Sequence, residues 1–153
     1  MHGLLGTVLL NAGRLEESLT AHHVAVKLGP QIAQRHYTLG VALKAAGSAA
    51  EAAECYRQAT SIHPAHAEAW SNLGSILQGS NQRNEAQSSY LKAIAAKPSY
   101  GDAHSNLGVL FHTGGQLELA IEAYRTALTL APAHPNAGQN LAMALRASEQ
   151  QSK

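Results

Sequence analysis

The chain repeats itself every 34 residues, and this period constrains its fold more than any other feature of the sequence. In the clearest unit, Ala67 to Tyr100, eight apolar or small residues stand at offsets that recur upstream and downstream without a slip. Within that unit they are Trp70, Leu73, Gly74, Leu77, Ala86, Tyr90, Ala93 and Pro98. A unit of this length cannot bury its apolar face alone, so the period predicts stacked copies that share one continuous core.

Each unit is predicted to be a pair of helices. The apolar residues are three and four apart, the spacing of an amphipathic helix. The first helix of each unit is expected to end where a residue tolerates the left-handed conformation, namely at Gly13, Gly47, Asn81 and Gly115. The second is expected to end near the prolines, which cannot continue a helix: Pro30, Pro64, Pro98 and Pro132.

These residues match the pattern W-x-x-L-G-x-x-Y, A-x-x-x-F, P, and the chain therefore resembles the tetratricopeptide repeat family. The resemblance implies an all-α fold, a right-handed superhelix (α-solenoid) of four helix-turn-helix repeats plus a C-terminal capping helix. The expected single array covers residues 1–147, with repeats at about 1–32, 33–66, 67–100 and 101–134 and a terminal helix at 135–147. Residues 148–153 are polar and are expected to be disordered. Repeat one carries Ser18 and His22 where alanine and tyrosine recur, so we expect its packing to be looser.

Composition excludes several classes of function. With 11 basic and 10 acidic residues among 153, the chain lacks the basic stripe that phosphate binding needs, and nucleic acid is not an expected partner. The single Cys55 cannot form an internal disulfide, which makes a reducing compartment such as the cytoplasm the default location. No apolar run is long enough for a membrane span, and Leu4 to Leu10 is assigned to the first helix instead of a signal peptide.

No enzyme chemistry is predicted. Nothing in the sequence arranges a nucleophile with a base and an orienting group, and Cys55 is interpreted as a small, partly buried side chain. His63, His66 and Glu68 could in principle approach a metal, but repetition of structure explains most of the histidines better. His36 and His104, for example, stand at the position of Trp70. We therefore expect no catalytic residues, no metal and no cofactor.

The candidate site is the concave surface formed by the first helices of the units. Asn72, Asn106 and Asn140 recur there, and a primary amide can donate to and accept from a peptide backbone at the same time. The alternative is that asparagine is common at this position of tetratricopeptide repeats for structural reasons, and the sequence leaves both open. The predicted peptide-binding residues are Tyr37, Thr38, Lys44, Asn72, Ser75, Gln78, Asn106, Val109, His112, Asn140 and Arg146.

The resemblance implies a protein-protein interaction scaffold that binds an extended peptide or partner segment in this groove. Because the asparagines resemble those of the repeat arm of O-linked N-acetylglucosamine transferase, the alternative is a substrate-recognition arm of a larger glycosyltransferase. The carboxylate clamp of heat-shock co-chaperones is disfavoured, since Glu68, Asp102 and asparagines occupy the places of its basic residues. Self-association through the first helix is also possible, because repeat one cannot bury all of its leucines.

Overall fold

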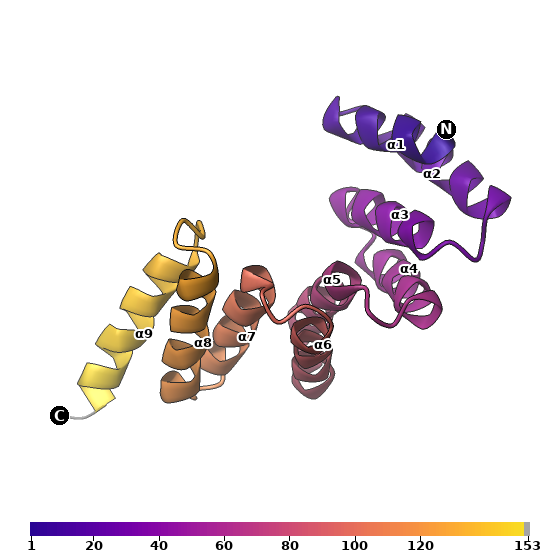
Figure 1. Cartoon of the computed structure of the whole chain (residues 1–153). Coiled ribbons are helices and arrows are strands. Elements are labelled where there is room, and N and C mark those ends of the chain that lie inside the picture. The colour runs from indigo at the N-terminus through magenta and orange to yellow at the C-terminus, as the bar shows by residue number, and fades with distance from the viewer. Residues whose placement is uncertain (152–153) are drawn as a thin grey trace.

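The structure is a computed structural model that describes residues 1–151, and within that part of the chain all regular structure is helical. Consecutive helices form hairpins, which stack into an array with the two ends of the chain far apart (Figure 1). The hairpins pair α1 (His2–Asn11) with α2 (Leu15–Leu28), α3 (Ala33–Ala45) with α4 (Ala49–Ile62), α5 (Ala67–Gly79) with α6 (Arg83–Ala96) and α7 (Gly101–Thr113) with α8 (Leu117–Leu130). A last helix, α9 (Ala137–Gln151), packs on α8. The expected α-solenoid is confirmed.

The first helix of each hairpin ends as predicted. Gly13, Gly47 and Gly115 have positive φ, and Asn81 with φ 61° is the one non-glycine residue that does so in residues 1–151. In each case the next residue's N–H reaches back five positions, as Gln82 N does to Leu77 O at 2.9 Å, which is the Schellman arrangement. The left-handed residue therefore both ends the helix and satisfies its last carbonyls.

The last helix differs from its predicted limits of 135–147. It begins at Ala137 and continues to Gln151, so the expectation of a disordered tail is wrong for residues 148–151. No glycine or proline follows Ala147, and Glu149, Gln150 and Gln151 are good helix formers, so nothing local stops the helix. The rest of the predicted tail, residues 152–153, lies outside the described residues.

The array bends because its two layers of helices pack differently. Successive first helices touch directly at α1–α3, α5–α7 and α7–α9, whereas successive second helices do not make comparable contacts. The first helices are therefore closer together and form the inner layer, which leaves an open concave side between the two arms of the array (Figure 1). We call the exposed surface of α1, α3, α5, α7 and α9 on this side the concave face.

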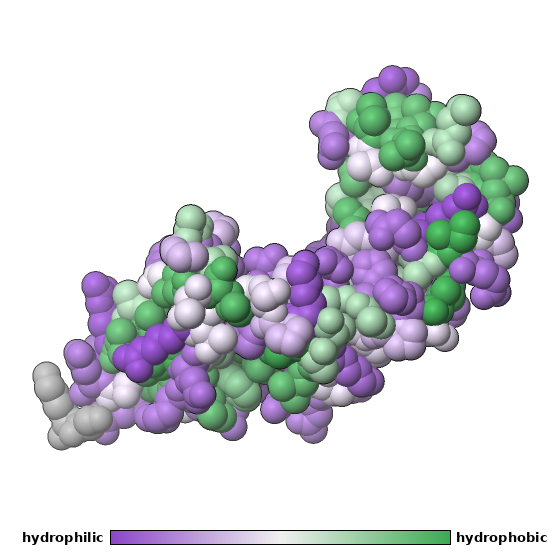
Figure 2. All heavy atoms as spheres, viewed as in Figure 1, coloured by the Kyte–Doolittle hydropathy of each residue, from purple (hydrophilic) through white to green (hydrophobic). Residues whose placement is uncertain are grey.

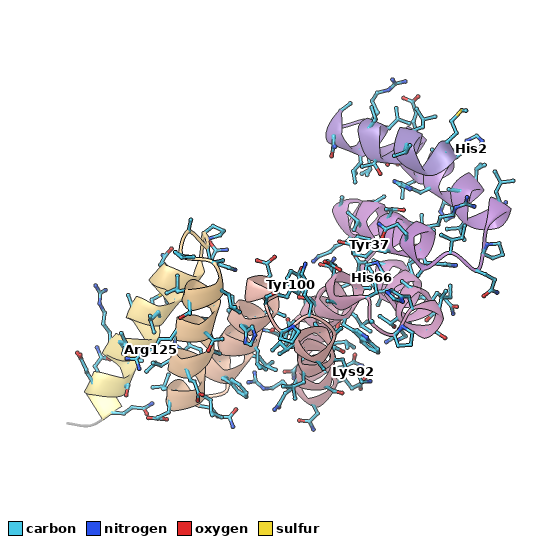
Figure 3. All side chains as sticks on the ribbon, viewed as in Figure 1. His2, Tyr37, His66, Lys92, Tyr100 and Arg125 are labelled. Atoms are coloured by element: carbon cyan, nitrogen blue, oxygen red, sulfur yellow. The ribbon has the colours of Figure 1, made fainter. Side chains whose placement is uncertain are left out.

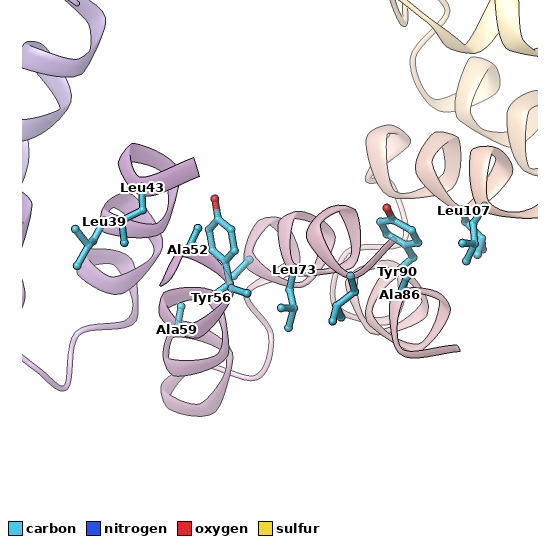
Figure 4. Packing of buried hydrophobic residues seen from close by; sticks show 13 residues of the cluster. Leu39, Leu43, Ala52, Tyr56, Ala59, Leu73, Ala86, Tyr90 and Leu107 are labelled. Atoms are coloured by element: carbon cyan, nitrogen blue, oxygen red, sulfur yellow. The ribbon is translucent and has the colours of Figure 1, made fainter. Parts of the chain in front are cut away.

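Inside each hairpin a tyrosine ring lies against a glycine of the partner helix. A Cβ added at Gly40, Gly74 or Gly108 would lie only 2.6–2.7 Å from the ring of Tyr56, Tyr90 or Tyr124, respectively. These rings are almost fully buried, and Figure 4 shows Tyr56 and Tyr90 with their hydroxyls toward the same side of the array. The recurring glycine thus makes room for an aromatic ring between the helices.

The first hairpin uses other residues in the same places. His22 stands at the tyrosine position and presses on Gly6, while Ser18 donates a hydrogen bond to Gly6 O at 2.8 Å. Both side chains are as buried as their counterparts in the other units, at 1% and 0% exposure. The substitutions that suggested looser packing therefore fill the same space.

The histidines at the tryptophan position keep one of its functions. Trp70 Nε1 donates to Pro64 O at 2.8 Å, and the Nε2 atoms of His36 and His104 contact Pro30 O and Pro98 O at 2.8 and 3.0 Å. An imidazole N–H replaces the indole N–H at the same carbonyl. These histidines therefore have a structural role, as the repetition predicted.

The N-terminal helix is open on one side. Leu4 is 78% and Val8 63% exposed, and Figure 2 shows hydrophobic side chains gathered over α1. Self-association through this helix stays a prediction.

None of the helices in residues 1–151 has the length and hydropathy needed to cross a bilayer.

Replacing Leu73 by alanine should lower the free energy of unfolding by about 2 to 5 kcal/mol. The side chain is 3% exposed and belongs to the core that joins several units. Thermal and urea unfolding measure the loss. Leu91→Ala, at a position 48% exposed, is the control, and equal losses for the two variants would contradict the core assignment.

The stability of the first hairpin should fall as the pH drops below about 6.5. Burial lowers the pKa of His22, and the nearby charge of His23 adds to this effect. The unfolded chain therefore takes up the proton first, and the stability present above the unfolded pKa is lost as the pH falls through it. Hydrogen exchange in residues 1–28 at pH 7.5 and 5 measures this opening.

The variant His22→Phe should flatten that pH dependence, because a ring without titratable nitrogens stays neutral. The exposed His63→Phe removes one histidine elsewhere and serves as the control. An unchanged pH dependence in His22→Phe would assign the effect to other groups.

Candidate functional site

The concave face carries three columns of polar side chains, each built from one position of successive first helices. The asparagine column is Thr38, Asn72, Asn106 and Asn140. The acidic column, nearer the helix starts, is Gln34, Glu68 and Asp102, and the basic column, nearer the helix ends, is Lys44, Gln78, His112 and Arg146. Because ten residues separate the outer columns along each helix, they lie roughly 15 Å apart.

The asparagine column holds neighbouring units together. Asn106 Nδ2 donates to Ser71 Oγ at 3.2 Å, across 35 residues. Asn72 makes the corresponding hydrogen bond one unit earlier, to Tyr37. Burial raises the pKa of Tyr37 and the charge of Glu68 raises it further, whereas the hydrogen bond from Asn72 lowers it. Both asparagines are half-buried. Each amide has two donors and an acceptor oxygen, so these bonds use only part of its capacity.

Acidic side chains near the start of a unit lie close to bases at the end of the same unit. Lys97 Nζ lies 3.4 Å from Glu68 Oε1, and His134 Nε2 lies 3.0 Å from Asp102 Oδ1. Partial burial alone would raise the pKa of Glu68, but a backbone N–H, Lys97 and His66 outweigh it and lower the pKa. Both side chains are nevertheless partly exposed, Glu68 at 38% and Asp102 at 60%.

Aromatic rings line the concave face beside the acidic column. The rings of Tyr37 and His66 are 4.7 Å apart, and Figure 3 shows both on the same side of the array as Tyr100. Burial raises the pKa of Tyr100, and the charges of Asp102 and Glu68 raise it further. Sequence reasoning missed His66 and Tyr100 because each precedes its helix and was read as a connection. The recurrence of a ring at residues 66, 100 and 134 was the available signal.

The basic column is only partly available to a ligand. Gln78 Oε1 accepts a hydrogen bond from Tyr90 Oη at 2.9 Å, and the His112 ring meets the Tyr124 ring edge-on at 6.5 Å. Lys44 and Arg146 are exposed.

Between the columns, Ser75 is half-buried, while Val109 packs on the cluster of Ala120, Tyr124 and Ala144. Thr38 donates to Arg35 O at 3.1 Å. The predicted residues thus share one face, but Val109 and Gln78 are engaged within the fold.

The opposite, convex side carries a different feature. Lys92 Nζ lies 4.4 Å from the centre of the Trp70 ring, and Figure 3 shows Lys92 on the other side of the array from Tyr37.

Burial raises the pKa of Cys55 to about 11, which keeps this thiol protonated and weakly nucleophilic at neutral pH. In residues 1–151 no three His, Cys, Asp or Glu side chains are grouped to hold a metal.

Comparisons with known proteins agree on the repeat. Two family models, each described as tetratricopeptide repeat, match residues 33–76 and 73–135. A search of curated proteins gives no match.

Among solved structures, pilF of Pseudomonas aeruginosa superposes with a TM-score of 0.88 at 23% identity, covering 97% of this chain and 68% of that one. The first TPR of Spaghetti (RPAP3), bound to the HSP90 peptide SRMEEVD, gives a TM-score of 0.74 at 25% identity, covering 78% and 94%. YrrB, described as a TPR protein with an unusual peptide-binding site, gives 0.76 at 19% identity, covering 97% and 76%.

Replacing Gln78 by alanine should destabilise the fold by about 1 to 3 kcal/mol, because the buried Tyr90 hydroxyl loses its acceptor. Lys44→Ala is the matched control, since Lys44 stands at the same position one unit earlier and the hydroxyl of Tyr56 has no partner to lose. Unfolding in urea measures both variants. Equal effects would mean that the Gln78 contact contributes nothing.

Proposed function

Because this chain belongs to the tetratricopeptide repeat family, and is on that basis a protein-interaction scaffold, we propose that its concave face binds an extended segment of a partner protein. The asparagine column carries the proposal. Its amides recur in the third unit, the fourth unit and α9, and those of Asn72 and Asn106 keep unused donor and acceptor groups after their bonds within the fold.

The spacing of the column suits an extended chain. Packed helices lie roughly 8 to 10 Å apart, and an extended chain advances about 3.3 Å per residue. Asn72, Asn106 and Asn140 would therefore meet the backbone at about every third residue. Bonds to backbone give affinity without selecting side chains, so sequence preference has to come from the columns on either side.

Charge distinguishes the two edges of the groove. Glu68 and Asp102 on one edge favour basic side chains, whereas Lys44 and Arg146 on the other favour acidic ones. The side chains of an extended segment point alternately to its two sides, so one segment can meet both edges. The preferred ligand is therefore an extended, mostly uncharged segment with a basic group toward the helix starts and an acidic group toward the helix ends.

A solved relative supports peptide binding as the mode of action. The first TPR of Spaghetti (RPAP3), 25% identical over 78% of this chain, is bound to a peptide of HSP90. In this chain Glu68 and Asp102 stand on the concave face, so an acidic peptide is not the ligand that we propose.

The second candidate, a substrate-recognition arm of a larger glycosyltransferase, rests on the same asparagine column. It needs a catalytic domain on the same polypeptide. Sequencing the gene on both sides of this stretch tests it, since an open reading frame without a transferase domain would exclude the idea.

Combining Asn72→Ala with Asn106→Ala should weaken the binding of a selected peptide at least tenfold. The probe is a peptide selected from a display library against the parent chain, measured by fluorescence anisotropy. The control combines Asn11→Ala with Asn84→Ala, two exposed asparagines that belong to none of the three columns. Unchanged affinity in a folded column variant would return the asparagines to a structural role and move the site elsewhere.

Added salt should weaken the same complex only modestly. Ionic contacts at the edges are screened, whereas amide bonds to the backbone are not. Titrations at 50 and 500 mM NaCl measure the effect, and a complex abolished at the higher concentration would identify charge as the main source of affinity.

A further inference from the structure

The concave face has a pocket between α1 and α3 that no column accounts for. Its volume is about 430 Å³, within the range of small-molecule pockets. Apolar groups of Leu4, Ala25, Leu28 and Ile32 form most of its wall. Thr38 and Gln34, the first members of the asparagine and acidic columns, stand at its edge. The pocket is therefore continuous with the groove and lies at its N-terminal end.

Comparison with the second unit explains why the pocket is open. In the next unit the same space is filled by two aromatic rings, Tyr37 from α3 and His66 before α5, with centroids 4.7 Å apart. One period upstream, Gly3 stands at the position of Tyr37 and Ile32 at the position of His66. An added Cβ at Gly3 would meet only Ala25 Cβ at 4.0 Å, so the space beside this glycine is open.

A cation flanks the same space. Arg35 is half-buried and its Nη1 donates to Ala25 O at 2.8 Å, which fixes the guanidinium at the wall of the pocket. The equivalent residues one and two units later, Ala69 and Ala103, are buried alanines. An immobilised guanidinium attracts the face of an aromatic ring more than an aliphatic side chain.

We propose that this pocket receives an aromatic side chain of the partner segment, in the place that Tyr37 and His66 fill one unit later. The proposal rests on the proposed function, since the same segment would continue along the asparagine column. It adds a preference for an aromatic side chain to the charge preference of the two edge columns, and the asparagine column supplies neither, because amides that bind backbone do not select a side chain. The preferred segment thus carries a phenylalanine, tyrosine or tryptophan where it reaches α1.

The test uses N-acetyl-tryptophanamide as the probe, with N-acetyl-alaninamide as the control. Titrated into the ¹⁵N-labelled full chain, the aromatic amide should shift the backbone signals of Gly3, Ala25 and Thr38 saturably, with a Kd on the order of 1 mM. The alanine amide should not. Shifts that are absent, or spread evenly over the array, would overturn the proposal.

Two variants localise the probe. Gly3→Tyr places in the pocket the ring that the next unit already has, and should weaken the aromatic amide at least tenfold. Gln139→Tyr adds the same side chain at the equivalent position of α9 and should leave binding unchanged. Leu28→Ser, at a side chain 68% exposed, should also weaken binding, with Leu130→Ser at the same repeat position as its control. Binding that none of the pocket variants alters would overturn the proposal.

Failure of this inference and failure of the proposed function are separable. The double variant of Asn72 and Asn106 should weaken the selected peptide and leave the aromatic amide unaffected. A concentration-dependent dimer that Gly3→Tyr converts to a monomer, with no shift from the aromatic amide, would assign the pocket to a second copy of the chain and overturn the proposal.

Discussion

The contact between a tyrosine ring and a glycine inside each hairpin is the interaction on which the rest of the structure depends. Gly40, Gly74 and Gly108 have no Cβ, and the rings of Tyr56, Tyr90 and Tyr124 occupy that space. A side chain at the glycine would have to displace a ring whose surroundings are close-packed. The ring therefore sets the position of one helix of a unit relative to the other. Because the same tyrosine and glycine recur, successive units have the same geometry.

Side-chain contacts within and between units give the concave face its second role. Asn106 is bonded to Ser71 of the preceding unit, whereas Lys97 lies close to Glu68, and His134 to Asp102, within one unit. A structural and a binding role are compatible at these positions, because amides and carboxylates have more hydrogen-bonding capacity than the fold uses. Since the same bonds hold the side chains in place, a partner would meet groups whose conformational entropy is already reduced.

Repetition accounts for the fold, and departures from it account for the distinctive surface of this chain. Where Gly3 and Ile32 stand at the positions that Tyr37 and His66 occupy one unit later, the concave face opens into a pocket. Where His22 replaces a tyrosine, the core acquires a buried titratable group without a hydrogen-bond partner. Both departures lie in the first unit. That unit therefore differs chemically from the units that follow.

The sequence by itself determined the helices, their order and most of their ends. These depend on local chemistry: the three-and-four spacing of apolar residues, the left-handed φ of Gly13, Gly47, Asn81 and Gly115, and the prolines that stop each second helix. It also placed the candidate residues on one face, because a fixed period puts equivalent positions in line. The end of α9 was mispredicted, since no residue there marks a stop and polarity alone does not end a helix.

Only the tertiary structure decided which of those side chains are free. Gln78 is bonded to Tyr90, whereas Lys44 at the equivalent position is exposed, and Val109 packs against α8 and α9. These differences depend on groups brought together from two helices or two units. The pocket beside Gly3 likewise needs the walls of three helices at once. Such contacts arise only when packing brings residues that are distant in the sequence within a few ångströms of each other. Local sequence patterns do not predict which residues these are.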